Sequence, residues 1–399
     1  MTVRAGQRNS AGDEMQSVKC KVKSEGAPRG SGQSAFCILH LRRGFTLVEL
    51  LVVIAIISMV TLATVPMILP ALDSRRIRES ARIVSTQFAS AQSEAIAKGR
   101  PVGVWIDRLS KTAATGTTAA MDLFLCEAPQ PYAGDDTASG INSIIVDSTT
   151  KIATIKFSPT DASAQQAAFF HPGDLIRFNF RGPYFQIPGT ASGGQPSNAA
   201  TNNGEDITYN ASQGLQIAPI SASDYDSAGK PIYRALPAAA YTATGWQNVP
   251  YQILRRPVKS TSGPVQLPAG AIVDLYWSGM GSTGSFASPT AAQAQEPILV
   301  TFDRTGALDG LYIGGVKQSI TSPLFFLIGK REKVVGIQTD PTQYNWLDLE
   351  NIWVAINPQT GNITTAEVAA IPTGGSLTAA QALAASRQYA QAAQAMGGR

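Results

Sequence analysis

One long apolar segment near the N-terminus limits what this 399-residue chain can fold into more than any other feature. It runs from Phe45 to Leu69, and its only polar side chains are those of Thr46, Glu49, Ser58, Thr61 and Thr64. A helix of that length is about 37 Å long, enough to cross a bilayer core of about 30 Å. Because no later segment is comparably apolar, we predict a single membrane-spanning helix over residues 45–69.

The charges on either side of this segment predict its orientation. Residues 1–44 carry eight basic and three acidic side chains, whereas the rest of the chain carries 24 basic and 25 acidic ones. Because cytoplasmic flanks of membrane helices are rich in Lys and Arg, we predict a cytoplasmic N-terminus and an exported body. That body is nearly neutral, so it gives no sign of the basic face that nucleic-acid binding requires.

Glu49 is unusual because a carboxylate inside a membrane helix costs free energy unless it is paired with a cation or hydrated. One interpretation places Glu49 at the membrane interface, still in contact with water. No basic side chain lies near it on the apolar side of the segment. The residues around Glu49 favour a second interpretation, in which the carboxylate has a partner outside its own chain.

The segment Gly44–Glu49, which reads GFTLVE, resembles the N-terminal signal of type IV pilins and type II secretion pseudopilins. In that family a prepilin peptidase cuts after the glycine, and the new N-terminal residue is usually N-methylated. The resemblance implies cleavage between Gly44 and Phe45, methylation of Phe45, and pairing of Glu49 with the Phe45 amine of a neighbouring subunit. Pro66 would be residue 22 of the mature chain, where many pilins carry a helix-kinking proline.

Two features of the N-terminus bear on this interpretation. A leader of 44 residues is long for the family, so translation could begin at Met15 or later. An ordinary secretory signal peptide is the main competitor, but the apolar run is too long for its hydrophobic region and a good A-x-A cleavage site is missing. We therefore retain the prepilin-type signal.

The chain turns polar after residue 72 but keeps a helical pattern up to residue 98. Apolar side chains recur every three or four positions, at Ile77, Ala81, Val84, Phe88, Ala91, Ala95 and Ile96. Gly99 follows as a stop signal. We predict one helix over residues 45–98, with its second half packed on a globular head; the alternative is two helices divided at Pro66 and Pro70.

From residue 99 onward the apolar period changes to two, which indicates strands. The predicted strands are Val102–Ile106, Met121–Cys126, Ile141–Val146, Lys151–Phe157, Leu175–Phe180, Tyr251–Leu254, Ile272–Trp277, Ile298–Phe302, Leu324–Ile328 and Ile352–Ile356. A closing hairpin is predicted with Asn362–Val368. The fold class is therefore α+β, a long N-terminal transmembrane helix followed by an antiparallel β-rich, pilin-like head.

Parts of the head resemble the minor pseudopilin H/FimT group, above all the passage over residues 88–102 from the helix into the first strand. The head is well over twice as long as such a domain, so the resemblance implies insertions. Residues 189–206 and 278–296 contain few large apolar side chains, and we predict that both are solvated loops. The predicted organisation is a leader over 1–44, a helix over 45–98, a β-rich head over 99–371 and an Ala/Gln-rich tail over 372–399 with a marginal helix.

Patterns that could carry chemistry in the head are few. The segment Gly279–Gly284 matches G-x-G-x-x-G, but no amphipathic helix follows, as a dinucleotide site would require. His171 precedes Pro172 and Gly173, so we predict that it lies in a turn. Cys126 is predicted to be a buried strand residue rather than a nucleophile.

Carboxylate pairs are the remaining candidates for a ligand site. Asp135 with Asp136, and Asp303 with Asp309, could ligate calcium, which some pseudopilin heads bind, but the calcium-loop spacing of an EF-hand is absent. We interpret all four as turn residues. Only three cysteines and two histidines are present, too few for a disulfide scaffold or a His-rich metal site. We predict no catalytic residue, no cofactor, no metal and no enzymatic activity.

The function that these features imply is structural. The resemblance indicates a minor pseudopilin of a type II secretion system, processed by a prepilin peptidase and extracted from the bacterial inner membrane into a short periplasmic filament. Its expected partners are that peptidase, other pilins or pseudopilins, the membrane and candidate exported proteins, with no nucleic acid. The alternatives are a minor type IV pilin for adhesion, motility or DNA uptake, and a periplasmic enzyme held by a signal anchor.

Overall fold

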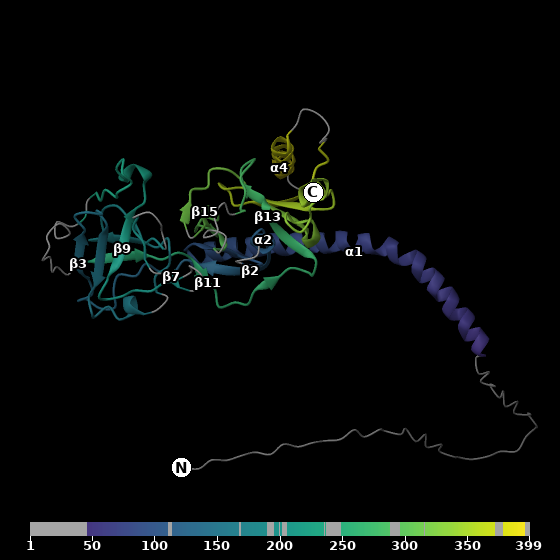
Figure 1. Cartoon of the computed structure of the whole chain (residues 1–399), viewed down its shortest axis with the longest axis horizontal. Coiled ribbons are helices and arrows are strands. Elements are labelled where there is room, and N and C mark those ends of the chain that lie inside the picture. The colour runs from purple at the N-terminus through teal and green to yellow at the C-terminus, as the bar shows by residue number, and fades with distance from the viewer. Residues whose placement is uncertain are drawn as a thin grey trace, which may run out of the picture. The chain divides into compact units, whose positions relative to one another are not determined.

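The computed structural model describes residues 46–110, 114–166, 169–189, 195–198, 200–201, 206–234, 236, 249–287, 296–314, 316–371 and 378–395. For residues 63–71, 114–115, 200–201, 222, 316 and 393–395 it describes the backbone alone. The chain separates into two compact units, residues 1–61 and residues 62–399. The first unit contains the start of a long helix, and the second contains the rest of that helix and all of the strands (Figure 1).

The predicted N-terminal helix is confirmed as one continuous element, α1 (Leu47–Lys98). It ends where predicted, because Gly99 takes a φ of 64° and donates its N–H to the Ala95 carbonyl oxygen at 3.0 Å. Within the second unit, six of the seven predicted contact residues are buried. Ile96 is the exception at 53% exposure, because it follows Ala95 directly and so lies about 100° around the helix from the buried face.

The larger sheet is antiparallel and provides the surface on which α1 packs. Its strand order is β16-β15-β14-β1-β2-β13-β17-β18-β19, and two short strands, β11 and β12, also pair with β2. The bounds are β1 Val102–Arg108, β2 Ala119–Glu127, β11 Val258–Lys259, β12 Val265–Gln266, β13 Ala271–Met280, β14 Ile298–Phe302, β15 Leu308–Ile313, β16 Val316–Gln318, β17 Leu324–Lys330, β18 Ile352–Ile356 and β19 Ile363–Glu367. A four-residue helix, α2 (Ala114–Thr117), precedes β2.

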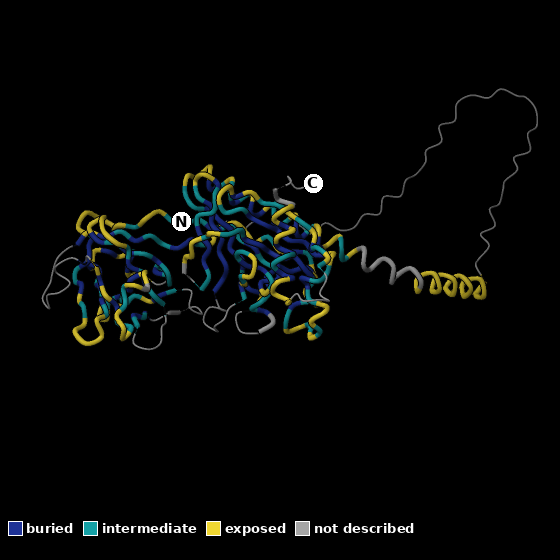
Figure 2. Tube along the Cα trace, turned by 90° about the horizontal axis from the view of Figure 1, so that it is seen from above, coloured by how far each residue is buried: buried dark blue, intermediate teal, exposed yellow. Residues whose placement is uncertain are grey.

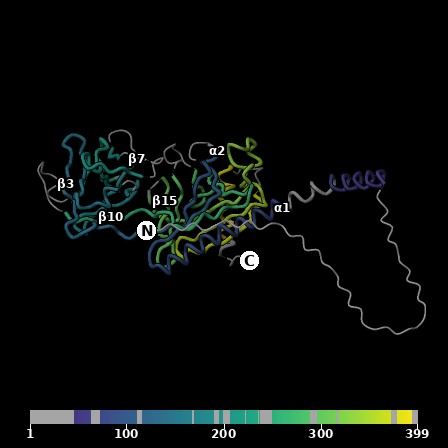
Figure 3. Tube along the Cα trace, turned by 90° about the horizontal axis from the view of Figure 1, so that it is seen from below, coloured from purple at the N-terminus to yellow at the C-terminus, as the bar shows by residue number. Residues whose placement is uncertain are grey.

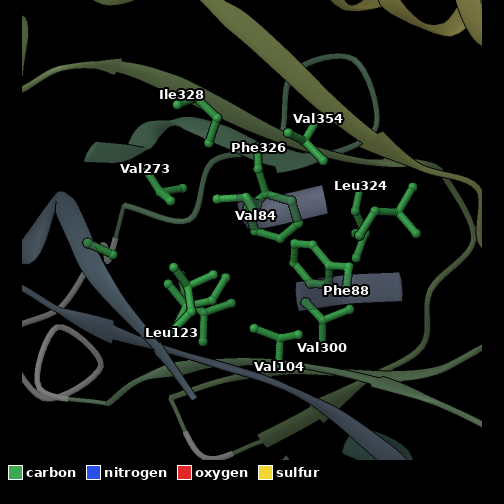
Figure 4. Packing of buried hydrophobic residues seen from close by; sticks show 14 of the residues in the cluster. Val84, Phe88, Val104, Leu123, Val273, Val300, Leu324, Phe326, Ile328 and Val354 are labelled. Carbon is green, nitrogen blue, oxygen red and sulfur yellow. The ribbon is translucent and has the colours of Figure 1, made fainter. Parts of the chain in front are cut away.

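The two faces of this sheet bury different partners. On one face, Val84 and Phe88 of α1 pack among sheet residues such as Phe326, as Figure 4 shows. Phe325, its neighbour in β17, points the opposite way and packs with Trp353 and with Leu383 of the C-terminal helix α4 (Ala379–Ala395). The alternation of side chains along each strand therefore lets one sheet hold both helices.

A second, six-stranded sheet interrupts the first between β2 and β11. Its order is β10-β5-β6-β9-β4-β3. The bounds are β3 Ile141–Val146, β4 Ala153–Phe157, β5 Leu175–Phe178, β6 Phe185–Gln186, β9 Leu215–Pro219 and β10 Tyr251–Leu254, with a small hairpin of β7 (Ala200–Thr201) and β8 (Asp206–Ile207). The edges meet, because Ile141 and Val249 exchange both backbone hydrogen bonds and Tyr132 does the same with Ile253. Because the bridge from Ile141 to Val249 joins the β3 edge to the residues just before β10, we call this part of the chain, residues 128–257, the inserted barrel.

The inserted barrel has a hydrophobic core of its own. Its buried side chains come from all six strands and form a cluster that shares no member with the cluster around α1. Phe157, Phe170 and Tyr251 contribute stacked and edge-on aromatic contacts at 5.2–5.3 Å between ring centroids. Figure 2 shows buried, dark blue stretches both in this region and around α1. A core of this kind supports a module that folds around its own residues.

All ten predicted strands are present, with small differences at their ends. The predicted strand over 151–157 begins only at Ala153, because Lys151 takes a φ of 61° in the preceding turn. The predicted strand over 175–180 ends at Phe178, because Asn179 and Phe180 also have positive φ values. The longer strands missing from the sequence prediction are β9 and β15.

Two predictions about loops were wrong in part. Residues 278–296 are not simply a solvated loop, because β13 extends to Met280, and Ser278 and Phe286 are buried. In the described part of residues 189–206, Asn198 is buried at 9% exposure and short strands form. The predicted tail helix is present, and its buried residues are Ala382, Leu383, Ser386, Arg387 and Ala390, whereas Tyr389 is 62% exposed.

Candidate functional site

The first turn of α1 contains the described residues of the predicted assembly site. Thr46 caps the helix, since its Oγ1 accepts the N–H of Glu49 at 3.2 Å and its carbonyl oxygen accepts the N–H of Leu50 at 3.1 Å. Thr46 and Glu49 stand at the spacing of a capping box, of which the structure forms the half donated by the Glu49 N–H. A carboxylate in the first turn also faces the positive end of the helix dipole. This cap was missed in the sequence, although the T-x-x-E spacing signals it.

The helix surface after this turn is apolar and uncovered. Every residue from 46 to 62 is exposed. The large apolar side chains range from 42% exposure at Val53 to 83% at Leu62, and they point to all sides of the helix rather than to one stripe. A continuous apolar surface of this kind is found where a membrane or other chains cover it. We call residues 47–62 the apolar collar.

Other parts of the predicted N-terminal site are outside the described residues. Gly44 and Phe45, with the whole leader, are among them, so cleavage, methylation and pairing of the Phe45 amine with Glu49 stay predictions. Pro66 lies within α1, but its side chain is not described, and the predicted kink is likewise untested. A helix long and apolar enough to span a membrane is not found among the residues that the structure describes.

The glycine-rich segment of the head has a packing role. A Cβ at Gly279 would lie 2.0 Å from the Gly284 carbonyl oxygen, so the chain can pass this close only without side chains. The carbonyl oxygens of Gly281 and Gly284 each accept a hydrogen bond from Arg387 at 2.9 Å. A phosphate cradle needs N–H groups that point at the ligand. Here the carbonyl groups point at a buried cation instead.

The other polar candidates of the head also have structural partners. The His171 Nε2 lies 3.3 Å from Asp206 Oδ1, and its backbone N–H donates to the buried Asp174. Cys126 is fully buried, as predicted, and burial raises the pKa of its thiol far above the ordinary value. A thiol held protonated in this way is a poor nucleophile.

The structure places the two carboxylates of the pair Asp303 and Asp309 in different settings, a turn and a strand. Asp303 accepts backbone N–H groups of Thr305 and Ala307 and so closes a turn, as predicted. Asp309 is instead a strand residue of β15, and its carboxylate pairs with Lys317 Nζ at 2.8 Å. Within the described ranges, no group of three or more His, Cys, Asp or Glu side chains could hold a metal ion.

Comparison with known proteins identifies the N-terminal segment. Residues 39–65 match the family model described as the prokaryotic N-terminal methylation motif. This motif is the prepilin cleavage signal of type IV pilins and pseudopilins, so the chain carries a signal of that class. The match includes Gly44, Phe45 and Glu49 but ends before the head. Neither the curated proteins nor the solved structures gave a match to the chain.

Proposed function

We propose that this protein is a structural subunit of a pilin-like filament, and specifically a minor pseudopilin of a type II secretion system. It would be inserted in the bacterial inner membrane with its N-terminus in the cytoplasm and its head in the periplasm. A prepilin peptidase would cut it after Gly44, and the mature chain would enter a short periplasmic filament. The observation that carries the proposal is that the methylation motif, residues 39–65, includes the exposed apolar collar of α1.

The physical basis of the assembly is the burial of the apolar collar. In the membrane, lipid would cover residues 47–62, and in the filament the collars of neighbouring subunits would cover one another. Cleavage would create a positive amine on Phe45 at the same time as it frees the subunit. The Glu49 carboxylate of a neighbour would pair with that amine, and a buried pair of this kind sets the stagger between subunits.

The second candidate is a minor type IV pilin, which shares the signal and the helix. The near-neutral body of the chain argues against DNA uptake, which would favour a basic head. The third candidate is an enzyme held at the membrane by a signal anchor, and it predicts an uncut N-terminus. A comparison of exported proteins in the medium with pili on the cell surface separates the first two candidates.

The decisive experiment is to determine the mature N-terminus by mass spectrometry of protein extracted from membranes. We expect a chain that begins at N-methylated Phe45. A chain that retains Arg42 and Arg43, or one that is cut near Ala63, would contradict the proposal and favour the anchored enzyme.

A substitution at Glu49 tests assembly in the same cells. We expect Glu49→Ala to be processed normally but to reduce incorporation into filaments by tenfold or more, because the Phe45 amine would be buried without its partner. Glu79→Ala is the matched control, since Glu79 is an exposed carboxylate later in the same helix. Filament incorporation is measured by cross-linking of sheared or solubilised filaments.

A further inference from the structure

The turn between β5 and β6 of the inserted barrel holds an aromatic residue in a strained conformation. Asn179 and Phe180 have φ values of 54° and 53°, and the N–H of Arg181 donates to the Phe178 carbonyl oxygen at 3.1 Å. Positive φ at both central residues is the pattern of a type I′ turn, for which Asn followed by Gly is preferred. This turn lies within a longer connection, since the β5–β6 register ends at the pair Ile176 and Phe185. Asn179 fits the first position. Phe180 occupies the place of the glycine, where a bulky side chain is disfavoured.

Burial does not account for this conformation. Phe180 remains 49% exposed, and Asn179, Arg181, Gly182 and Pro183 are all exposed. A Cβ added at Gly182 would meet no atom within 4 Å, so the turn projects into open space. A strained backbone that exposes an aromatic ring indicates a role at the surface, because the fold alone would be served better by glycine.

Two side chains that flank this turn in the sequence, those of Arg177 and Tyr184, are held by contacts with other residues. The Arg177 guanidinium lies 5.1 Å from the centre of the Tyr184 ring, and its Nε donates to Gln252 of β10 at 2.8 Å. Arginine and tyrosine are the residue types enriched where binding energy concentrates at protein interfaces. Residues 175–204 contain two arginines and no acidic residue. We call Phe180 with Arg177, Arg181 and Tyr184 the aromatic tip.

The topology of the barrel directs binding to its loops. The outer edges of β3 and β10 are each bridged by one residue outside the named strands, Val249 and Tyr132 respectively, which limits the addition of a partner strand there. The chain enters the barrel after β2 and returns at β11, and Glu127 of β2 pairs directly with Val258 of β11. The barrel is therefore an addition to the sheet that holds α1, and its loops can serve a partner without altering that sheet.

We propose that the aromatic tip docks a partner protein that offers an apolar pocket bordered by carboxylates. The Phe180 ring would fill the pocket, and the Arg181 guanidinium would face the acidic rim. This inference rests on the proposed function, under which the partner is an exported protein. A membrane surface fits less well, because binding to lipid requires several apolar side chains in one plane, and the tip exposes one aromatic ring.

The test compares Phe180→Gly with the parent in the full-length chain, expressed in its own host. We expect the amount of at least one exported protein in the medium to fall tenfold or more, because loss of a central aromatic anchor typically weakens binding by that much. The variant should incorporate into filaments normally. Its melting temperature should be equal to or higher than that of the parent, because glycine removes the strain.

Two further variants and a cross-linking experiment test the same proposal. Arg181→Glu should reduce export of the same protein, because it reverses the charge that faces the acidic rim. Tyr389→Ala removes an aromatic residue of α4 that is even more exposed than Phe180, at 62%, and should leave export unchanged. A photoreactive benzoylphenylalanine at position 180 should cross-link the same exported protein, whereas the same group at position 389 should not.

Several outcomes would overturn the inference. The first is that Phe180→Gly exports the same amount of protein as the parent. The second is that position 180 cross-links only to another filament subunit. The third is that the only defect of Phe180→Gly is a loss of binding to phosphatidylglycerol vesicles. Failure of the proposed function is distinguishable, because Glu49→Ala would then assemble normally whatever the behaviour of position 180.

Discussion

At the scale of single residues, the buried side chain of Arg387 links the tail helix to the larger sheet. Its side chain is 1% exposed and donates to three backbone carbonyl oxygens, those of Trp277, Gly281 and Gly284. Burial lowers the pKa of its guanidinium to about 10, so the group remains charged at neutral pH. One residue of the tail helix therefore donates hydrogen bonds to backbone carbonyl groups of β13 and of the glycine-rich segment after it.

Replacing Arg387 should destabilise the head strongly. We expect Arg387→Met to lower the free energy of unfolding by about 3–5 kcal/mol, because three carbonyl groups would lose a charged donor inside the protein. Urea denaturation followed by tryptophan fluorescence measures the change. Arg234→Met is the control, because the Arg234 side chain is 71% exposed and its loss should cost at most about 0.5 kcal/mol. Similar losses for both variants would contradict the packing role of Arg387.

At the scale of elements, α1 shows what a periodic pattern can predict. The spacing of apolar residues identified the buried face from Ile77 to Ala95, because each step of three or four residues returns to the same side of the helix. A pattern cannot show where a turn residue overrides it, and the strand predicted through residue 180 illustrates this. The T-x-x-E cap at Thr46 was readable from the sequence, whereas the strain at Phe180 required the φ values.

The packing of α1 on the sheet can be tested with two apolar residues of the same helix. Phe88 is fully buried, and its ring lies 5.1 Å from that of Phe326. We expect Phe88→Ala to lower the free energy of unfolding by about 3–5 kcal/mol, because it leaves a cavity. Ile96→Ala should cost less than about 1 kcal/mol, because half of that side chain is already in water. Chemical denaturation of the head distinguishes the two.

The end of α1 is joined to β2 by charges, which predicts a dependence on pH. Glu127 accepts hydrogen bonds from Lys98 Nζ at 3.0 Å and from Arg100 at 2.9 Å. The pKa of its carboxyl is lowered, mainly by the hydrogen bond from Lys98. Since the folded pKa lies below the unfolded one, the stabilisation is present above the unfolded value and is lost as pH falls through the folded pKa.

Glu127→Gln should therefore be less stable than the parent at pH 7, by at most about 1 kcal/mol because the site is partly exposed. The difference between the two proteins should shrink as the pH falls below about 4, where the carboxylate of the parent becomes protonated. Thermal unfolding measured from pH 3 to pH 7 gives both values. A difference that stays constant over this range would argue against the ion pair.

At the scale of the whole molecule, two separate hydrophobic cores serve two tasks. The sheet around α1 supports the helix, and the inserted barrel carries the aromatic tip. The sequence indicated that the head contains insertions but not that one insertion forms a six-stranded sheet with its own core, since β-strand pairing over long distances leaves no local signal. Small residues also concealed the packing of α4, whose buried positions include Ala382 and Ala390.

Separate cores should unfold separately. We expect Phe170→Ala to remove a fully buried ring from the barrel and to increase amide hydrogen exchange across residues 141–254. Strands β17 and β18 should keep the protection seen in the parent. Hydrogen exchange followed by mass spectrometry measures both regions in one experiment. Equal loss of protection in both regions would show that the head unfolds as a single cooperative unit.

The pairing of Glu127 with Val258 has a mechanical consequence. Both connections of the inserted barrel leave the larger sheet at neighbouring positions, so a force transmitted along α1 and its sheet does not pass through the barrel in series. The barrel is attached to the larger sheet at one place and therefore does not carry that force. Its loops could diverge from one chain to another while the tensile strength of the filament subunit stays the same.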